Sequence, residues 1–412
     1  MEGGRFGYYS VTAAIAFPAW IYVEDTKSLS VCMLVTNFDA FTGGVQRNSR
    51  LILSELNKRG VRTYVCARNY YNLAKNETKD GTVFHRSPVV GSSRSANGIV
   101  YLIDTLFWLI VNRKKYDVVH CQQMFGPTMV AAVSSFITGK PILTRITLSG
   151  DTGEAKAVRR MPLSSLRVRL IKRVAKWVAL SSEMKAELEE LGVPAGKIRV
   201  IPNSTELPAT PAFDELARSE MRRNLELPYD KIAVFAGRLS EEKGLDTLIE
   251  AWHSVNQTYP YAHLLLLGEG GEYRNVEAEL KRRCEELGLN GNVHFLGHVA
   301  NAKDYILACD VFVLPSKAEG MSNALVEAFA CGAAIVATDI PANAGICENG
   351  ANSLLVPVAE PVPLHDAIMR LFDSPDLRER IGRGARSKAE RELSVETMIN
   401  SYIESYREIT VS

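Results

Sequence analysis

Residues 311–331 read VFVLPSKAEGMSNALVEAFAC, and this stretch indicates the fold class. It opens on Val311–Leu314, a short apolar run typical of a strand that is buried on both faces. After a polar loop, Ser322 provides a suitable N-cap for a helix near 322–331. A buried strand that leads through one loop into a helix is the unit from which parallel α/β sheets are built.

The same alternation continues in both directions along the chain. We therefore predict an α/β protein with two parallel sheets, each covered by helices on both faces. The expected strands of the first half are Leu29–Thr36, Val61–Ala67, Asp117–Cys121, Pro141–Ile146, Trp177–Leu180 and Ile198–Ile201, with a helix from Gln46 to Arg59. Those of the second half are Ile232–Ala236, His263–Leu267, Val293–Leu296, Val311–Leu314 and Ala334–Ala337, with helices near 244–257, 273–287, 302–308 and 322–331.

Chain length and the position of the prolines suggest the domain boundaries. A chain of 412 residues is too long for one ordinary core and suits two domains of about 200 residues each. We expect a first domain over 1–205, of which 1–28 form an extra N-terminal segment, and a second domain over 206–393. The Pro-containing stretch 202–228 joins them, and we expect the final helix, within 394–412, to pack back on the first domain.

Composition narrows the class of protein and its setting. A hydrophobic content of 46% and a charged content of 23% are those of a soluble globular protein. The seven cysteines stand singly, which argues against a zinc site and a disulfide framework and favours a reducing cytoplasm. The apolar runs Val11–Val23 and Ile99–Val111 have 13 residues each, too few to span a bilayer, and we expect the second to be a core helix.

Charge is divided unevenly between the two halves. Residues 1–202 carry a net charge of +13, and residues 203–412 carry −12. We expect the basic half to face something anionic: a phosphorylated substrate, membrane phospholipid or nucleic acid.

Polar side chains follow the strand Val311–Leu314, at the edge where open parallel sheets bind ligands. Glu319 lies in the loop, and the amides of residues 323–325 open the helix, where first-turn N–H groups can hold a phosphate. Glu327, about one helical turn further on, is placed to accept hydrogen bonds from ribose hydroxyls. The pattern suits a sugar diphosphate, but by itself it equally suits a solvated loop carboxylate and a helix surface charge.

A second strand-to-helix junction carries two cations. Arg238 and Lys243 follow the strand Ile232–Ala236 within Gly-Arg-Leu-Ser-Glu-Glu-Lys-Gly, where together they would neutralise a diphosphate. Cations are slightly unfavourable at a helix start, which favours a function for them. The loops Gly-Glu-Gly-Gly (268–271) and Phe-Leu-Gly-His-Val (295–299) follow neighbouring strands and would wall a flat base at the same edge.

Taken in order, the chain carries Gly-Arg-Leu-x-x-x-Lys-Gly, Leu-Gly-x-Gly, Phe-Leu-Gly and Glu-Gly-x-x-Asn-x-Leu-x-Glu-Ala. Thr-Gly-Gly-Val-Gln-Arg (42–47), Tyr-Asp-Val-Val-His (116–120) and Ile-Pro-Asn-Ser (201–204) precede them. This order resembles the retaining glycosyltransferases of the GT-B fold, family 4 (glycosyl transferases group 1), from about residue 29 onward. The resemblance implies two Rossmann-like domains whose parallel sheets face a central cleft, the first on the acceptor side and the second binding the donor.

The resemblance also implies roles for individual residues. Arg238 and Lys243 would hold the donor diphosphate and stabilise its charge, and Glu319 would contact the hydroxyls of the donor sugar. The further donor contacts would be Gly43, Gly44, Gly237, Gly268, Val299, Asn323, Ala324, Leu325 and, on the ribose, Glu327. The family requires no metal and no cofactor, and its usual proposal is a front-face substitution that rests on charge stabilisation and positioning.

One position departs from the family pattern. Many relatives carry His-x-His where this chain has His120-Cys121-Gln122. The resemblance implies that His120 belongs to the catalytic set and that Gln122 and Arg47 contact the acceptor or the sugar, although His120 equally suits a strand-end histidine. Gln122 can hydrogen-bond a hydroxyl but cannot act as a cation, which bears on the choice of donor.

A strongly basic segment lies late in the first half. Seven cations and no acidic residue occur between positions 159 and 176, namely Arg159, Arg160, Arg167, Arg169, Lys172, Arg173 and Lys176. Leu163, Leu166, Leu170, Val174 and Trp177 recur at helical spacing, so we expect one basic amphipathic helix on an anionic membrane surface. The alternative is a helix that packs on its own sheet with a solvated basic face. Nucleic acid is a poorer partner because no aromatic platform accompanies the charge.

The sequence thus predicts a retaining transfer of a sugar from a nucleotide sugar, with a UDP-sugar favoured, to a hydroxyl of a saccharide or lipid-linked acceptor. The expected setting is the biosynthesis of a cell-surface polysaccharide or glycolipid, in the cytoplasm or peripherally on the cytoplasmic membrane face. A nucleotide-sugar epimerase of related fold is an alternative, but it needs an acid/base pair that these motifs do not supply. A non-catalytic sugar-nucleotide-binding protein is the other alternative, which the joint presence of Arg238, Lys243 and Glu319 disfavours.

Overall fold

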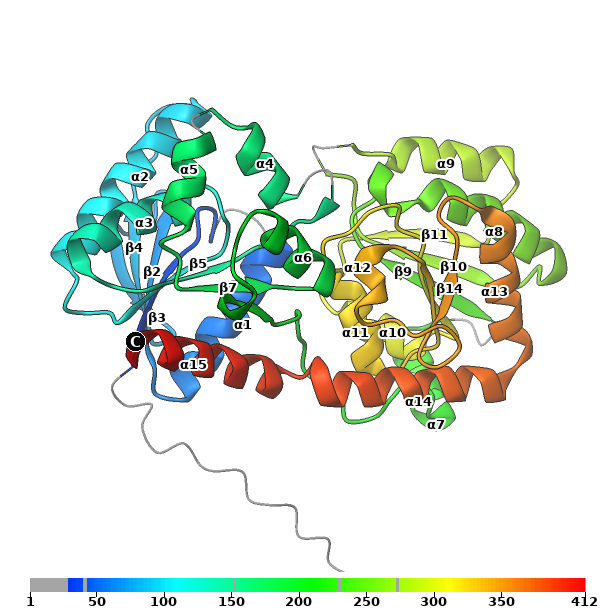
Figure 1. Ribbon diagram of the computed structural model, residues 1–412. Coiled ribbons are helices and arrows are strands. Elements are labelled where there is room, and N and C mark those ends of the chain that lie inside the picture. The colour runs from blue at the N-terminus through cyan, green and yellow to red at the C-terminus, as the bar shows by residue number, and fades with distance from the viewer. Residues whose placement is uncertain are drawn as a thin grey trace, which may run out of the picture.

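The computed structural model describes residues 29–39, 43–150, 153–162, 164–227, 231–271 and 274–411, without the side chain of Arg94. The expected N-terminal segment, with the run Val11–Val23, lies outside these residues. Within them the chain forms two α/β domains, each built on its own sheet, and Figure 1 shows the two side by side.

The first domain is an eight-stranded sheet in the order β3-β4-β2-β1-β5-β6-β7-β8. Neighbouring strands run parallel except β3 and β4, which are antiparallel. The central strand β1 is buried along its whole length because apolar side chains face helices on both sides of the sheet. The strands are β1 (Ser30–Leu34), β2 (Arg62–Arg68), β3 (Asn76–Lys79), β4 (Thr82–Ser87), β5 (Val118–Cys121), β6 (Ile142–Arg145), β7 (Lys176–Ala179) and β8 (Ile198–Val200).

Two helical layers cover this sheet. Most of the helices pack over one face, because right-handed crossovers from β4 through β8 all step in the same direction across the sheet. These are α2 (Arg94–Val111), α3 (Gly126–Thr138), α4 (Glu154–Arg160), α5 (Ser164–Ile171) and α6 (Ser182–Glu190), with a 3-10 turn at Ala195–Lys197. The other face is covered by α1 (Gly44–Lys58) and by the last helix of the chain, α15 (Val395–Val411).

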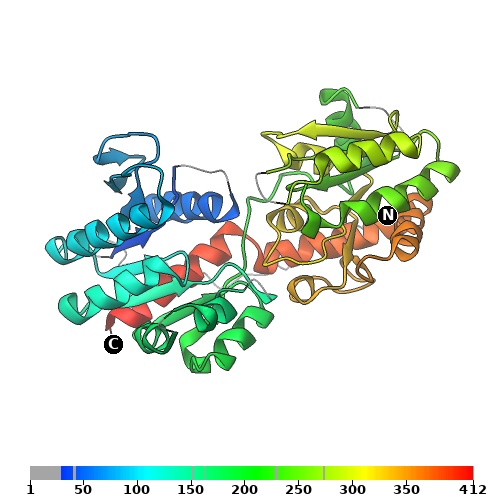
Figure 2. The same cartoon turned by 90° about the horizontal axis from the view of Figure 1, so that it is seen from above.

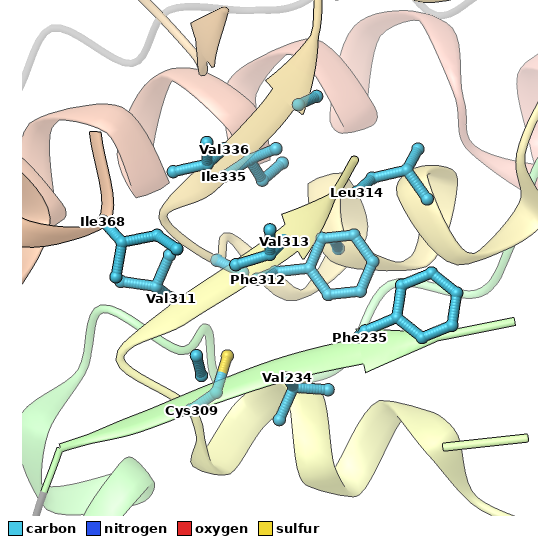
Figure 3. Packing of buried hydrophobic residues seen from close by; sticks show 14 of the residues in the cluster. Val234, Phe235, Cys309, Val311, Phe312, Val313, Leu314, Ile335, Val336 and Ile368 are labelled. Carbon is cyan, nitrogen blue, oxygen red and sulfur yellow. The ribbon is translucent and has the colours of Figure 1, made fainter. Parts of the chain in front are cut away.

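The second domain is a six-stranded parallel sheet in the order β11-β10-β9-β12-β13-β14. Its strands are β9 (Ile232–Ala236), β10 (His263–Leu267), β11 (Val293–Gly297), β12 (Val311–Leu314), β13 (Ile335–Thr338) and β14 (Leu354–Val356). Its helices are α7 (Glu215–Asn224), α8 (Leu245–Thr258), α9 (Glu277–Glu286), α10 (Ala302–Ala308), α11 (Asn323–Cys331), α12 (Pro341–Ala344), α13 (Pro361–Asp373) and α14 (Pro375–Glu392), with a 3-10 turn at Glu241–Lys243. Figure 3 shows Phe235 of β9 beside Phe312 of β12 in the core of this domain.

The chain returns to the first domain at its end. After α14 closes the second domain, α15 runs beneath the first sheet, as Figures 1 and 2 show. Its side chains Tyr402 and Tyr406 are buried in the core of the first domain. The last helix is therefore part of the first domain's core, although it follows the whole second domain in sequence.

The prediction of two parallel sheets is confirmed, and the predicted strands agree with the observed ones to within two residues. The sequence pattern misses β3, β4 and β14. The strand β3 is an exposed, polar edge strand, and β14 has only three residues, so neither offers the long apolar run by which the other strands were recognised.

The prediction of one basic helix between Arg159 and Trp177 is wrong. Helix α4 ends at Arg160, Pro162 follows, α5 ends at Ile171, and strand β7 begins at Lys176. A proline disfavours helical continuation because it lacks an N–H and restricts the residue before it. Lys176 is also wrong as a membrane-surface residue, since its side chain is nearly buried and its ammonium lies 2.6 Å from the Glu408 carboxylate of α15.

The prediction that Ile99–Val111 is a core helix holds for only one side of α2. Tyr101, Thr105 and Leu109 are buried against the sheet, whereas Ile103 and Phe107 on the opposite side are exposed. In the part of the chain that the structure describes, no helix is long and apolar enough to cross a membrane.

Candidate active site

The loop that follows β12 brings together two of the predicted catalytic residues. The Lys243 ammonium forms an ion pair with the Glu319 carboxylate, and the two side chains are only 12% and 9% exposed. The Ser316 hydroxyl donates to the same Glu319 oxygen at 2.7 Å. Desolvation strengthens such a pair, so a cation and a carboxylate are fixed side by side at the carboxyl edge of the second sheet.

This loop also contacts the first domain. The backbone carbonyl of Glu319 accepts a hydrogen bond from the Ser149 hydroxyl at 3.3 Å. At Gly320 a Cβ would lie 2.5 Å from the Thr147 carbonyl oxygen, so a side chain there would push the domains apart. The loop that follows β12 therefore lies between the two domains rather than on an open edge.

The second predicted cation, Arg238, has a different environment. Its guanidinium is largely exposed and forms an ion pair with Glu242 at 3.0 Å. The Ser240 hydroxyl holds the same carboxylate at 2.7 Å. Burial acts to raise the pKa of Glu242, but the Ser240 hydrogen bond and the neighbouring cations outweigh it and lower that pKa below its usual value. An anionic Glu242 thus holds Arg238 near the edge of the site while leaving its donors accessible.

Glycines let the backbone loops around these cations approach closely. At Gly268, with φ +138°, a Cβ would lie 1.8 Å from the carbonyl oxygen of Gly237, and the Gly268 amide donates to Gly297 at 2.7 Å. The loops after β9, β10 and β11 are therefore in direct contact, which matches their expected place on one edge. Half-buried Val299 lies two residues past β11 and packs against the domain core.

Helix α11 begins where the sequence predicts. Ser322 is the N-cap, and its hydroxyl accepts from the Leu325 amide at 3.4 Å. The expectation that Leu325 offers a free amide is therefore wrong, because its own cap occupies it. Asn323 and Ala324 open the helix, and their N–H groups have no acceptor within it, so the positive end of the helix dipole points at the loop.

The last predicted donor contact, Glu327, is nearly buried and is paired across the domain boundary. Its carboxylate forms an ion pair with Arg47 of α1. At Gly44, the first residue of α1, a Cβ would lie 2.8 Å from the Asn323 side-chain nitrogen, whereas Gly43, the N-cap, lies against Gln46 of its own helix. Of the two glycines, it is therefore Gly44 that lets the start of α1 approach Asn323 at the start of α11.

A cavity of about 250 Å³ opens beside this contact. Both domains line it, the first through Arg47 and Asn48 and the second through Lys303, Asn323 and Glu327. With Glu206, which also lines it, the cavity presents two carboxamides, two cations and two carboxylates, which suit a polar ligand rich in hydroxyl groups.

His120 and Gln122 lie deeper than the other candidates. Both side chains are fully buried, and the His120 ring contacts the Tyr406 hydroxyl of α15 at 2.7 Å. Burial, helped by the charge of Arg145, lowers the pKa of His120 to about 3, so its ring is neutral. In this structure the histidine packs between the sheet and α15 and has no exposed surface toward the cleft.

Sequence reasoning missed the residues that connect these candidates. Arg145, at the end of β6, is fully buried and donates to the Gln122 side-chain oxygen at 2.9 Å and to the Asn203 side-chain oxygen. Asn203 in turn donates to the Asn323 side-chain oxygen at 2.9 Å. Asn203 was visible only as part of the Ile-Pro-Asn-Ser motif, and no pattern distinguished Arg145 from other strand-end arginines.

Comparisons with known proteins identify both domains. Residues 42–207 match the family described as Glycosyltransferase Family 4, and residues 217–388 match the family described as Glycosyl transferases group 1. The chain belongs to the group 1 glycosyltransferases of the GT-B fold. In this family member, Gly44 and Arg47 fall in the first matched region, and Arg238, Lys243, Glu319 and Glu327 fall in the second.

Two relatives of this group 1 glycosyltransferase and one solved structure of similar fold are informative. The lipopolysaccharide core biosynthesis glycosyltransferases LpsD and LpsE of Rhizobium meliloti (strain 1021) are 31% and 30% identical over 231 and 209 residues. These matches cover 56% and 50% of this chain but only 62% and 57% of LpsD and LpsE. The crystal structure of HepE from Anabaena in complex with UDP has a TM-score of 0.76 at 20% identity, covering 92% of this chain and 100% of HepE, and supports the GT-B fold.

Proposed function

We propose that this protein transfers a sugar from a UDP-sugar to a hydroxyl group of a saccharide or lipid-linked acceptor, with retention of the anomeric configuration. The observation that carries the proposal is the nearly buried Lys243–Glu319 pair between the start of α11 and the glycine loops after β9 and β10. A nucleotide sugar carries a diphosphate, which cations and the amides at a helix start can bind, and sugar hydroxyls, which can donate to a carboxylate.

In the proposed reaction, the protein stabilises the charge of the leaving diphosphate. Lys243 and Arg238 supply two positive charges, and the amino end of α11 adds its dipole. Glu319 would exchange its contact with Lys243 for hydroxyl groups of the donor sugar, and Glu327 would exchange Arg47 for the ribose. We propose that these groups suffice without a resident metal ion, so that transfer after dialysis against EDTA retains its rate within about twofold.

The relatives support the choice of donor and setting. HepE binds UDP and UDP-glucose in its crystal structures, and LpsD and LpsE take their names from lipopolysaccharide core biosynthesis. A UDP-sugar donor and a glycolipid or polysaccharide acceptor are therefore the first to assay. All seven cysteines are free and buried, which supports a cytoplasmic reaction.

A thermal-shift screen across UDP-, GDP- and ADP-sugars tests the donor. A ligand that binds only the folded state stabilises it by about 2.7 kcal/mol at a hundredfold excess over its Kd, so the true donor raises Tm measurably. No shift with any UDP-sugar would contradict the proposed donor. Incubation with the donor alone tests the epimerase alternative, because epimerisation requires no acceptor.

Replacement of Lys243 tests the site itself. Lys243→Ala removes the buried cation, and we expect transfer to fall by at least about a hundredfold, as for the loss of other preorganised charge-stabilising donors. The matched control is Lys281→Ala, which removes an exposed lysine paired with Glu277 on α9. Unchanged transfer by Lys243→Ala would refute the assignment of the diphosphate site. The anomeric configuration of the product, read by NMR, tests retention.

A further inference from the structure

An apolar ridge runs along the outer side of α2. Ile99, Ile103, Phe107 and Val111 are spaced four residues apart, lie on one side of the helix, and are 58–69% exposed. Tyr101, Thr105 and Leu109, on the opposite side of the helix, are buried against the sheet. The helix therefore already packs on the domain core, and its outer side is apolar as well. An outward-facing helix side in a soluble domain normally carries polar residues, and four large apolar groups in line mark a contact surface.

The neighbouring helices extend this ridge. Helix α3 packs beside α2, and α5 packs beside α3, as Figures 1 and 2 show from two directions. Phe136 and Ile137 of α3 are 64% and 61% exposed, and Val133 of α3 and Leu166 of α5 are also exposed. We call the eight side chains the outer apolar face: Ile99, Ile103, Phe107, Val111, Val133, Phe136, Ile137 and Leu166.

Cations border the outer apolar face at the end where the helices finish. The helices α2, α3 and α5 all follow parallel strands, so their carboxyl ends lie at the same edge of the domain. Arg113, Lys114 and Lys115 follow α2 and are exposed, Lys140 follows α3, and Lys172 and Arg173 follow α5. The Arg173 guanidinium lies 4.5 Å from the Phe136 ring centroid, so positive charge and exposed ring are in contact.

Acidic groups are scarce on the same face. The three helices contain one acidic residue, Asp104, whose carboxylate turns inward to His85 and Ser87 at 2.7 Å. Asp117, just after the cations that follow α2, is held by Ser30 and by Lys140. Apolar side chains bordered by cations fit a surface that is apolar inside and negatively charged outside.

We infer that the outer apolar face inserts into the headgroup region of an anionic phospholipid membrane. Apolar side chains gain free energy on leaving water, and each nearby lysine or arginine adds attraction to the charged headgroups. A second copy of this chain fits less well, because pairing two such faces would bring two sets of cations together in a domain of net charge +13.

The position of this face also explains how a membrane-bound acceptor would reach the cleft. Helices α2 and α3 start at the carboxyl ends of β4 and β5, the edge that faces the second domain. The apolar ridge begins there with Ile99 and runs away from the cleft, and the amide of exposed Val90 donates to the Asn97 side chain of the same helix at 2.6 Å. A lipid-linked saccharide could therefore keep its lipid in the membrane while its sugar enters the site; this part alone rests on the proposed function.

Vesicle flotation of the full chain tests the inference. We expect binding at about 50 mM salt to vesicles of phosphatidylcholine and phosphatidylglycerol at about 2:1, much less to phosphatidylcholine alone, and weaker binding at about 500 mM salt. Ile103→Ser with Phe107→Ser should reduce the membrane partition coefficient at least about tenfold, because two apolar anchors are lost. The matched control is Leu216→Ser with Val362→Ser, which removes two exposed apolar residues of the second domain.

A charge variant separates the electrostatic contribution to membrane binding from the apolar contribution. Lys114→Glu with Lys115→Glu should weaken binding to anionic vesicles and reduce its salt dependence, whereas Lys281→Glu, on α9 of the second domain, should not. Absence of binding by the wild-type chain, or unchanged binding by the Ile103 and Phe107 variant, would overturn the inference. So would a dimer in light scattering that this variant converts to a monomer without any vesicle binding. The thermal shift with UDP-sugars needs no vesicles, so failure of the proposed function would be seen separately.

Discussion

The carboxylate of Glu327 forms an ion pair with a residue of the opposite domain. Its buried carboxylate is paired with Arg47, so a ribose must replace a charged partner with its hydroxyl groups. Glu319 is likewise paired with a cation, Lys243, so the hydroxyl groups of a donor sugar would have to replace that partner. Both carboxylates are thus paired with cations of the protein itself, which avoids the cost of a buried and unpaired charge.

This pairing leads to a first prediction. Glu327→Gln keeps the size of the side chain but removes its charge, and a hydrogen bond to a charged group contributes about 1.5–3 kcal/mol. We expect UDP affinity, measured by calorimetry, to fall about tenfold or more. Tm should change little, because the partner Arg47 is more than half exposed and can be solvated. Glu286→Gln, on the surface of α9, is the control, and equal UDP affinity in both variants would contradict the ribose contact.

His120 gives a pH prediction at the same scale. Its pKa of about 3 in the folded protein lies below the usual unfolded value of about 6.5, so between these values the unfolded chain binds a proton that the native one does not. Its stabilising effect is therefore complete above pH 6.5 and is lost as pH falls toward 3, by up to about 1.4 kcal/mol per pH unit. Urea unfolding at pH 7.5, 6.5 and 5.5 measures this slope. We expect a shallower slope in His120→Gln than in the wild-type chain.

The candidate site residues that could be predicted from the sequence are those that come soon after the end of a strand. Lys243, Glu319 and Asn323 each follow a recognisable apolar strand, so their meeting at one sheet edge follows from the topology of parallel sheets. Arg145 and Asn203 could not be recognised in the same way, because their contact depends on how two domains and a linker are placed in space. The burial of His120 could not be predicted either, because Tyr406 of α15, which contacts its ring, lies 286 residues later in the sequence.

Among the elements, α15 completes the core of the first domain, although it follows the second domain in the sequence. Its two buried tyrosines contact the His120 ring at tilted angles. Its Glu404 and Glu408 pair with Arg199 and Lys176 of the first sheet. The apolar periodicity of a helix shows that it has a buried side but not which sheet that side contacts. The same limit explains α2, because its sequence is apolar on both its buried and its exposed side.

The contribution of α15 can be measured with two substitutions at one position. Tyr406→Ala removes a fully buried ring, and we expect the free energy of unfolding of the first domain to fall by about 3–5 kcal/mol, as for other large aromatic deletions. Tyr406→Phe removes only the hydroxyl that contacts His120 and should cost about 1–3 kcal/mol. Tyr261→Ala, at an exposed position of the second domain, is the control in urea unfolding. Equal stability of Tyr406→Ala and the control would mean that α15 does not belong to the folded core.

At the scale of the whole molecule, one group of the polar contacts between the two domains is centred on a single linker residue, Asn203. Asn203 follows the last strand of the first sheet, accepts from Arg145 and from Asn48, and donates to Asn323 at the start of α11. Two residues further on, Thr205 pairs with Ser394, where the chain crosses back toward α15. Both chain crossings between the domains therefore lie beside one carboxamide, which makes Asn203 the natural place for the domains to be coupled.

Two substitutions at Asn203 separate its contact with Arg145 from its contact with Asn323. Asn203→Ala removes an acceptor from the fully buried Arg145 guanidinium, so we expect a loss of about 1–3 kcal/mol in stability together with a lower kcat. Asn203→Asp gives Arg145 a carboxylate but cannot donate to Asn323, so stability should recover while kcat stays low. UDP affinity should change by less than about twofold in both, because the proposed nucleotide site lies in the second domain. The exposed control is Asn290→Ala. If both variants kept the wild-type kcat, the contact from Asn203 to Asn323 would have no part in aligning the two domains for transfer.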